Sequence, residues 1–294
     1  MSRLEILNSG SLRLDGRRPH ELRSLALHIT PENAHSNEFS SFNSGTNPKS
    51  DGSARVEQGL TVVHASVYGP REAKQRSNTL HDRAVIQCEV TIEPWSGRDR
   101  RKRSRADRRI AEICSALEST FEPVVQTHLY PRSTIDIFVS IERQDGGVLP
   151  CAINAVTLAL LDAGISMSDY VVALSVGLHL QSGKTLLDLS SHEETALPHL
   201  ITATLPRSGK ITLAQLETRI HANVVQEMLA VVGQACSVLH SEMDIAMQER
   251  TKKLADALGG GGLGNRNNEA ALTQQLLDSV QEDIEDDADH SMNM

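Results

Sequence analysis

Two stretches near the start of the chain have a β-rich pattern of apolar and polar residues and end in turn signals, as β-strands do. They cover residues 22–29 and 59–68, and the second ends at the turn-forming pair Gly69-Pro70. The residues between them, 31–52, are rich in Asn, Ser, Pro and Gly and contain almost no aliphatic side chains. Such a segment cannot bury enough apolar surface to order itself. The pattern predicts a strand pair interrupted by a disordered insertion at about 31–52.

The middle of the chain alternates strand and helix patterns. Residues 84–93 and 135–143 have the β-rich, period-2 pattern of strands. Residues 107–125 carry apolar side chains at helical spacing, and residues 152–163 are apolar nearly all round. The second of these segments ends at Gly164, where a helix commonly places a glycine. We expect a helix buried against a sheet there.

The last part of the chain predicts two hairpins and one long helix. The hairpins join residues 170–180 to 184–189 and residues 202–206 to 210–213. The helix covers about 216–258, with Val224, Met228, Leu229, Val232 and Val238 on its apolar side and an interruption near Gly233. A four-glycine run and an acidic polar stretch follow, so 259–294 is expected to be a flexible linker and disordered tail. Residues 1–258 are expected to form one domain of the α+β class.

Composition narrows the class of protein. A chain of 294 residues with 39% hydrophobic content can build a sizeable core. No run of about 18 apolar residues is present to span a bilayer, so we expect no membrane partner. The four cysteines are widely spaced without a CxxC pair, which favours reduced, buried thiols. No histidine pairs at ligand spacing with a cysteine or another histidine, so neither a metal nor a cofactor is expected.

The net charge of −9 is unevenly distributed. From Glu269 to Met294 there are eight acids and no Lys or Arg, so the first 268 residues carry a net charge of only −1. Between Arg98 and Arg109, by contrast, eight of twelve residues are basic. A run this dense is a candidate contact for the phosphates of a nucleic acid. A solvated loop or a nuclear-localisation-like patch would have the same composition.

Six short motifs occur in an order that resembles the RNase PH family. They are Arg13-Leu14-Asp15-Gly16-Arg17-Arg18 with Glu21 and Arg23, Val67-Tyr68-Gly69-Pro70, Tyr130-Pro131-Arg132-Ser133, Asp145-Gly146-Gly147, Ile153-Asn154-Ala155 and Asp162-Ala163-Gly164-Ile165. Together they cover roughly residues 13–257. The resemblance is greatest to the eukaryotic RNA exosome ring subunits that correspond to the active-type subunit of the archaeal exosome.

This resemblance implies a fold and an assembly. The fold would be RNase PH-like, also described as ribosomal protein S5 domain 2-like, with two similar β-sheet and helix halves. Related subunits pair as heterodimers and close a six-membered ring around a channel that threads single-stranded RNA. The resemblance also implies S1/KH-type cap subunits, a separate hydrolytic nuclease, and a location in the nucleus, including the nucleolus, and the cytoplasm.

The residues that would carry phosphorolysis depart from the family pattern. Active members place a Thr-Arg or Ser-Arg pair after the Asp-(Gly/Ala)-Gly segment, and the arginine can grip phosphate. Here those positions hold Val148 and Leu149, and Glu194 replaces the second of two aspartates, of which Asp188 is the first. These four positions are therefore predicted to be vestigial. We expect Asp188 to be a strand-end carboxylate with turn hydrogen bonds, and Glu193, Glu194 and Asp162 to be solvated or helix-linked.

Arginines supply the candidate RNA contacts. Two of them begin the predicted helix near residue 107, at the place where the family puts an arginine facing RNA or phosphate, and the others lie in the basic run or around the loop after Gly69-Pro70. The candidates are Arg108, Arg109, Arg71, Arg76, Arg83, Arg101 and Arg103. A cation at a helix start opposes the helix dipole, so an RNA phosphate would be a favourable partner there.

Three hypotheses for the function remain. The first is a non-catalytic ring subunit of the RNA exosome. The second is a phosphate-dependent 3′-to-5′ exoribonuclease that grips phosphate through Arg108, Arg109 or Arg132. The third is a stand-alone RNA-binding homo-oligomer.

Overall fold

The computed structural model describes residues 6–8, 10–29, 50–72, 80–98, 100, 107–180 and 182–291, with side chains as far as Asp256. The chain divides into two compact units, Met1–Met247 and Gln248–Met294. Most of the predicted insertion, Arg76, Arg101 and Arg103 lie outside the described residues. The features below belong to the first unit unless stated otherwise.

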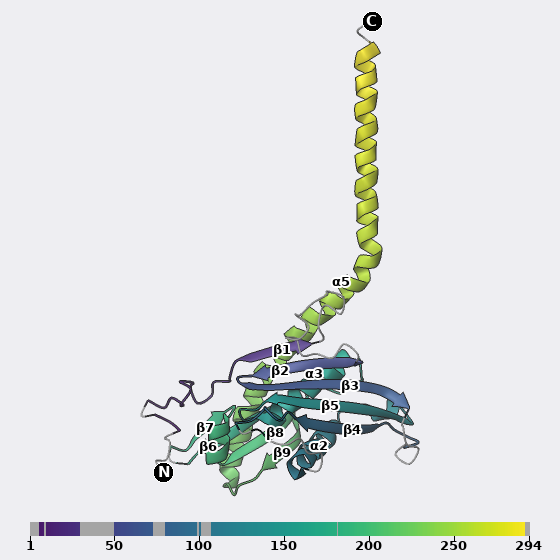
Figure 1. Ribbon diagram of the computed structural model, residues 1–294. Helices are drawn as coiled ribbons and strands as arrows, with labels where there is room; N and C mark the ends of the chain where they lie inside the picture. Colours follow the sequence, from purple (N-terminus) through teal and green to yellow (C-terminus); the bar gives the residue numbers. More distant parts are fainter. Residues whose placement is uncertain are drawn as a thin grey trace. The chain divides into compact units, whose positions relative to one another are not determined.

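The first sheet has five strands, which lie side by side in the order β1-β2-β3-β5-β4 (Figure 1). Every neighbouring pair is antiparallel except β4 and β5, which run parallel. The strands are β1 (Leu25–Ile29), β2 (Gly52–Gln58), β3 (Thr61–Glu72), β4 (Val85–Ile92) and β5 (Ser133–Arg143). The predicted strands at 84–93 and 135–143 are therefore confirmed.

The strand β2 was not expected from the sequence. The predicted strand pair was wrong in its pairing, because β1 and β3 do not contact directly: β2 lies between them and pairs with both. Its outward side chains, Arg55 and Glu57, are polar, and only Ala54 and Val56 supply apolar side chains to the core. That short apolar pattern is weak, and it follows directly on the polar insertion.

The second sheet has four strands in the order β7-β6-β8-β9. They are β6 (Val172–His179), β7 (Lys184–Leu187), β8 (His199–Leu205) and β9 (Lys210–Leu216), and all neighbours are antiparallel. Both predicted hairpins are confirmed. The strands of the second hairpin are longer than expected, so the residues from 210 to 216 are strand throughout.

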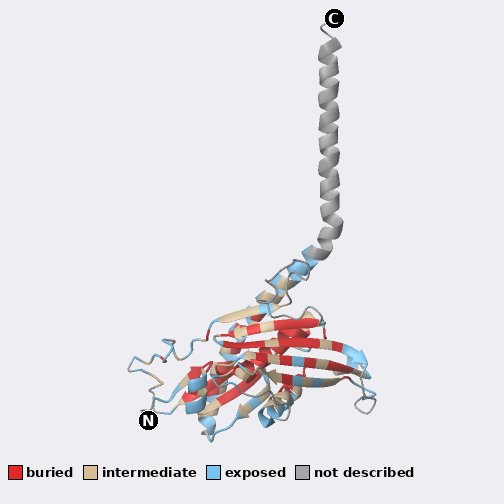
Figure 2. Cartoon of the chain, in the orientation of Figure 1, coloured by how far each residue is buried: buried red, intermediate tan, exposed pale blue. Residues whose placement is uncertain are grey.

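The helix α3 (Val148–Asp162) lies between the two sheets and contacts β2 and β3 on one side and β6 on the other. Every side chain from Leu149 to Leu160 is buried, and the continuous buried stretches of α3 and the sheets are visible in Figure 2. The all-round apolar pattern predicted this position. The helix begins four residues earlier than predicted, because Gly147 adopts a left-handed conformation (φ 60°) and serves as its N-cap.

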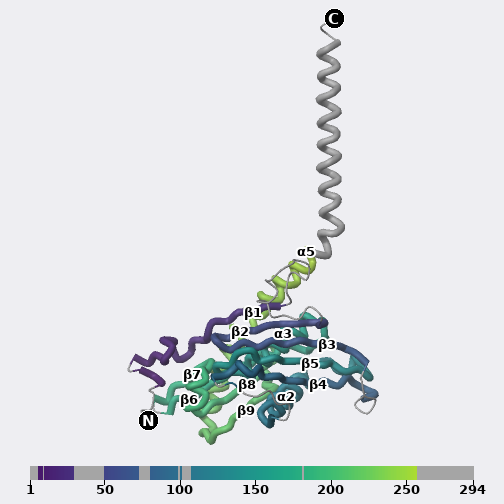
Figure 3. Tube along the Cα trace, in the orientation of Figure 1, coloured from purple at the N-terminus to yellow at the C-terminus, as the bar shows by residue number. Residues whose placement is uncertain are grey.

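Three further helices complete the fold, and the chain trace can be followed in Figure 3. They are α2 (Arg108–Phe121), α4 (Ser191–Ala196) and α5 (Ala222–Ser291), together with a 3₁₀ turn, η2 (Thr127–Leu129). The helix α2 contacts the edge strand β4 and also β9. Sheets packed on helices confirm the α+β class.

The long helix α5 differs from its prediction in two respects. It begins at Ala222, and it continues through Gly233 without a break. Its buried face repeats at helical spacing and consists of Met228, Val232, Cys236, Leu239 and Met243, whereas Val238 is 56% exposed. By length and hydropathy alone Ala222–Asp256 could cross a membrane, but this buried stripe is also what a core helix presents.

The backbone of α5 is helical to Ser291, including the four glycines at 259–262. The side chains beyond Asp256 lie outside the described residues. The flexible linker and acidic tail at 259–294 therefore stay predictions.

The close approach of β2 to α3 predicts a stability effect at Gly52. A Cβ added there would lie 2.3 Å from the carbonyl oxygen of Ala159, whereas one added at Gly233, on the exposed side of α5, would meet nothing. We expect Gly52→Ala to lower the free energy of unfolding by about 1–3 kcal/mol, because backbone must move to relieve the clash. Gly233→Ala is expected to raise it by about 0.5–1 kcal/mol, because alanine favours the helix. Urea unfolding of the two variants measures both changes, and a stable Gly52→Ala variant would contradict the packing.

Candidate functional site

A buried ion pair joins the two segments that the motifs place at the site. Asp188 follows β7, is 1% exposed and has a left-handed backbone (φ 53°). Arg23 donates from its backbone N–H to Oδ2 (2.8 Å) and from Nε and Nη2 to Oδ1 (3.0 and 2.7 Å). Asp188 is thus a strand-end carboxylate as expected, but an arginine, rather than the turn, supplies its partners. Both of its oxygens are occupied within the protein.

Arg23 also holds the loop between β5 and α3. Its Nη1 donates to the carbonyl oxygen of Asp145 (2.9 Å), and Thr61 Oγ1 donates to that of Gly146 (2.8 Å). A Cβ at Gly147 would lie 2.9 Å from Arg23 Nη2, so the guanidinium fills the space against this loop. Burial lowers the pKa of Arg23, but hydrogen bonds to Asp188 and its charge outweigh burial and raise the pKa above the ordinary value.

A second buried arginine supports the same region from the N-terminal segment. Arg13 is 3% exposed and donates to the carbonyl oxygens of Asp188 (3.1 Å), Pro19 (2.6 Å) and Leu187. Burial lowers its pKa, and the nearby carboxylate of Glu193 partly opposes that shift. Sequence reasoning used Arg13 and Arg23 only as markers of the family. Neither was predicted to build the site.

Glu193 is helix-linked, as predicted, but it is not solvated. It is 2% exposed, and it forms a reciprocal capping box with Ser190 at the start of α4. Its Oε2 also lies 3.6 Å from Arg13 Nη1. The exposed alternative is wrong for this residue because its carboxylate has two arginines and a helix N-terminus to neutralise it. His192, the second residue of α4, is exposed.

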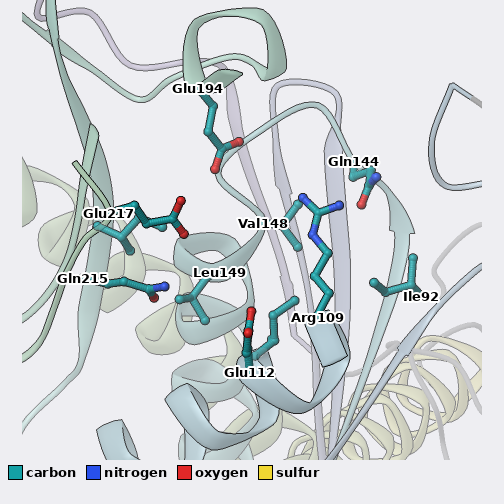
Figure 4. Close-up of a pocket in the computed structure, with 11 residues that line it drawn as sticks. Ile92, Arg109, Glu112, Gln144, Val148, Leu149, Glu194, Gln215 and Glu217 are labelled. Atoms are coloured by element: carbon teal, nitrogen blue, oxygen red, sulfur yellow. The ribbon is translucent and has the colours of Figure 1, made fainter. Parts of the chain in front are cut away.

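Three of the four vestigial positions line one pocket, whereas Asp188 is not among its lining residues. Val148 and Leu149 form the first turn of α3, Glu194 approaches from α4, and Arg109 approaches from α2 (Figure 4). The cavity has a volume of about 140 Å³. Leu149 is 8% exposed and belongs to the hydrophobic core. The position that would carry a phosphate-gripping arginine is therefore used for packing.

The anion-binding end of α3 is partly occupied by the protein itself. Glu194 Oε2 accepts a hydrogen bond from the backbone N–H of Gly147 (3.3 Å). Pro150, the third residue of the helix, has no N–H to offer. Helix N-termini bind anions through such free N–H groups. Here a carboxylate takes one of them, and only Val148 and Leu149 remain as possible donors in the first turn.

The electrostatics of the pocket do not favour an anion. Three carboxylates line it, those of Glu112, Glu194 and Glu217, against the single guanidinium of Arg109. Figure 4 shows the carboxylates of Glu194 and Glu217 directed into the same space as Arg109. An attacking phosphate would enter beside three negative charges and one positive charge. The pocket therefore lacks the cationic excess that phosphate binding needs.

The two arginines at the start of α2 have different environments. Asp107 is the N-cap and accepts the backbone N–H of Arg109 (3.2 Å), and Arg108 Nε donates to Glu112 Oε1 (2.9 Å) along the helix. Internal anions thus offset the unfavourable dipole at Arg108, so an RNA phosphate is not needed to explain that residue. The guanidinium of Arg109 has no ion-pair partner among the described residues and points into the pocket (Figure 4).

The other described arginine candidates lie at the opposite end of the first sheet. Arg71 ends β3 beside the start of β5, and it pairs with Asp51 (3.0 Å) and lies over the ring of Tyr68 (4.9 Å). Arg83 precedes β4 and lies 3.6 Å from Glu122, while Arg132 immediately precedes β5. Arg83 lies beside the C-terminal end of α2, about 20 Å along that helix from Arg109. Arg71 and Arg132 lie at the N-terminal end of β5, which is about 35 Å long, whereas the pocket lies at its C-terminal end. Arg132 therefore cannot grip phosphate there, and that part of the enzymatic alternative does not fit.

The cysteines agree with their prediction in part. All four are free thiols; Cys151 and Cys236 are buried, whereas Cys88 and Cys114 are half-buried. Burial raises the pKa of Cys151 to about 12 and that of Cys236 to about 11, so both remain neutral thiols. Within the part of the chain that the structure describes, no group of three His, Cys, Asp or Glu side chains could hold a metal ion.

Comparison with known proteins gives one consistent picture. A family model described as the 3′ exoribonuclease family, domain 1 (RNase_PH), matches residues 40–166. The mouse protein named Exosome complex component RRP41 is 37% identical over 261 residues, which is 88% of this chain and 100% of that protein. The fission yeast (Schizosaccharomyces pombe) protein named Exosome complex component ski6 is 36% identical over 252 residues, 86% of this chain and 97% of its own.

Two solved structures have the same fold. Rice Rrp46 superimposes with a TM-score of 0.68 at 24% identity, and covers 80% of this chain and 100% of its own. The Archaeoglobus fulgidus exosome with RNA bound to the active site gives a TM-score of 0.63 at 19% identity, over 79% of this chain and 93% of its own. The predicted RNase PH-like fold is confirmed.

The buried pair predicts that the site depends on Arg23 for its stability. Arg23→Met would leave the carboxylate of Asp188 buried without its cation, and we expect a loss of about 3–5 kcal/mol in the free energy of unfolding. The matched control is Arg83→Met, whose pair with Glu122 is exposed and should contribute about 0–1 kcal/mol. Chemical denaturation of both variants measures the difference. Equal losses would show that the Arg23 pair does not hold the loop.

Proposed function

Because the chain belongs to the 3′ exoribonuclease (RNase PH) family, we propose that it is a non-catalytic ring subunit of an RNA exosome that supports 3′-to-5′ processing and degradation of RNA. Its relatives of 36–37% identity, matched over nearly their whole length, are named exosome complex components. The family itself is one of phosphorolytic exoribonucleases. The names of the relatives support membership of an exosome, whereas the question of catalysis depends on the residues of the pocket.

The observation that carries the non-catalytic proposal is the pair Leu149 and Glu194. Phosphorolysis transfers a nucleotide from the RNA 3′ end to inorganic phosphate, so the phosphate must be held in line with the bond that breaks. The side chain of Leu149 offers no donor to hold it, and the carboxylate of Glu194 accepts the hydrogen bond of the Gly147 amide. Asp188, which would otherwise handle a metal or a proton, is saturated by Arg23. The phosphate-binding side chain, the free amide of Gly147 and the free carboxylate of Asp188 are therefore each lost for a separate reason.

The role that remains is to guide single-stranded RNA. Arg109, Arg71 and Arg83 offer exposed cations, and Arg76, Arg101 and Arg103, which lie outside the described residues, stay candidates from the sequence alone. The partners would be paralogous RNase PH-like subunits in a six-membered ring of heterodimers, S1/KH-type cap subunits and a separate hydrolytic nuclease. The location would be the nucleus, including the nucleolus, and the cytoplasm. The names of the relatives support this assembly.

One observation favours the enzymatic alternative. The guanidinium of Arg109, which has no ion-pair partner in the part of the chain that the structure describes, points into the pocket, where it could contact a phosphate. It stands against three carboxylates, however, and a single monodentate cation at the rim does not replace a bidentate grip beside a helix N-terminus. An assay for phosphate-dependent release of nucleotides distinguishes this alternative from the first proposal.

We expect the assembled ring, prepared without its hydrolytic nuclease, to release no nucleoside diphosphates from single-stranded RNA in phosphate buffer. The physical reason is that the pocket cannot hold the attacking phosphate. Thin-layer or anion-exchange chromatography of the products measures the release. Phosphate-dependent release that disappears in the Arg109→Gln ring would establish the enzymatic alternative and reject the proposal.

The two arginines that begin α2 should contribute unequally to RNA binding. Arg109→Gln is expected to weaken RNA binding by the ring and to reduce the slope of log K against log salt by about 0.7, the value for one phosphate contact on a single strand. Arg108→Gln is the matched control, because its guanidinium pairs with Glu112, and should change the slope less. Fluorescence anisotropy at several salt concentrations measures both. Equal effects would show that the helix start contacts RNA as a whole.

A further inference from the structure

Trp95 is the only tryptophan of the chain, and it is 65% exposed. It lies in the turn that follows β4, one residue after Pro94. An indole ring is among the largest apolar groups, and it usually contributes to a core or an interface. This ring contributes little to the core, so it is available to bind another molecule.

The turn that carries Trp95 is fixed by backbone hydrogen bonds. Glu93 N–H donates to the carbonyl oxygen of Ile141 (3.1 Å), and Ser96 N–H donates to that of Glu93 (3.0 Å). Gln144 N–H donates to the carbonyl oxygen of Ser96 (3.0 Å), and Ser96 is only 8% exposed. The indole is therefore presented by an ordered backbone. Little conformational entropy would be lost when a ligand stacks on it.

These hydrogen bonds also place the turn beside the pocket. Ile92, three residues before Trp95, and Gln144, bonded to the turn, both line the pocket next to Arg109 (Figure 4). The loop from Gln144 leads directly into the segment Asp145–Gly147 that Arg23 holds. Trp95 is therefore three residues from one residue that lines the pocket, in a turn that is hydrogen-bonded to another.

Cations follow the indole along the chain. Arg98 and Arg100 are both exposed, and Arg109 lies at the pocket itself. An exposed aromatic ring among cations is the combination with which proteins bind single-stranded nucleic acids: the cations contact the phosphates, and the ring stacks on a base. A protein partner would have to cover these arginines with acids, whereas RNA meets both requirements with a single strand.

We propose that Trp95 is a stacking platform for one base of single-stranded RNA beside the pocket, with Arg98 and Arg100 at the neighbouring phosphates. The inference rests on the proposed function, since it assumes that RNA passes this subunit. Every base has a π-face, so the contact is tolerant of sequence. The low aromatic content of the chain predicts no extensive stacking, and one ordered ring is consistent with that expectation.

The sole tryptophan makes the contact directly observable. We expect the intrinsic fluorescence of the full chain to be quenched by a short oligoadenylate, because a stacked base lies against the indole. Inorganic polyphosphate carries the charge without the bases, and it should compete for the arginines without quenching. Binding of oligoadenylate, detected by anisotropy, without any quenching would overturn the inference.

Three substitutions separate stacking from charge in the assembled ring. Trp95→Ala should lower the affinity for oligoadenylate about 5- to 150-fold, the range expected for one base on one ring. Its salt slope should stay unchanged, because stacking releases no counterions, and Trp95→Phe should retain most of the affinity. Arg98→Gln should instead reduce the salt slope by about 0.7. Because Trp95 is exposed, the thermal midpoint of Trp95→Ala should match that of the wild type.

The outcomes distinguish this inference from the function on which it rests. If the wild-type ring does not bind RNA, the proposed function fails. If the ring binds RNA and Trp95→Ala leaves the affinity unchanged, only the stacking platform is rejected. If Trp95→Ala prevents the chain from pairing with its paralogous subunit while RNA affinity is kept, Trp95 is an assembly contact and the inference is likewise wrong.

Discussion

The contact on which the rest of the site depends is the buried pair of Arg23 and Asp188. The two residues are 165 positions apart, and their contact brings together the N-terminal segment, the end of β7 and the loop before α3. Removing two charges from water is costly, and a buried pair by itself is weak evidence for stability. Here the remaining donors of the guanidinium bind Asp145 and Gly146, so the pair specifies the shape of the loop as well as neutralising the carboxylate.

In the function that we propose, residues that occupy the positions of a phosphorolytic site stabilise the fold instead. Asp188 stabilises Arg23, Leu149 packs in the core, and Glu194 places its carboxylate at the N-terminus of α3, where a negative charge is favourable. Each contact stabilises the fold without any ligand. A phosphate entering this pocket would have to displace the carboxylate of Glu194 from Gly147 and approach Glu112 and Glu217. The contacts around the pocket therefore stabilise the fold, and they oppose the binding of a phosphate.

The sequence predicted the strands and helices correctly where the apolar residues followed one clear period. The strands β4, β5, β6 and β8 and the buried helix α3 were found from their apolar patterns, because burial on one or both faces leaves a clear period. The strand β2 was missed because its apolar content is small and its neighbour in sequence is polar. The roles of Arg13 and Arg23 could not be predicted, because an arginine in a buried network has the same one-letter signature as one that faces a nucleic acid. Long-range contacts, rather than local pattern, decide between them.

The placement of the cations bears on how RNA would be held. Arg109 and the turn with Trp95 lie at one end of β5, and Arg71 and Arg83 lie at the other. A strand of RNA that touched both groups would run for roughly 20–35 Å, the lengths of α2 and β5, with few contacts at each end. Scattered phosphate contacts give modest, salt-dependent affinity without a fixed register. Weak binding without a fixed register suits a subunit along which RNA slides. An active site, by contrast, must hold the 3′ end of the RNA at one position.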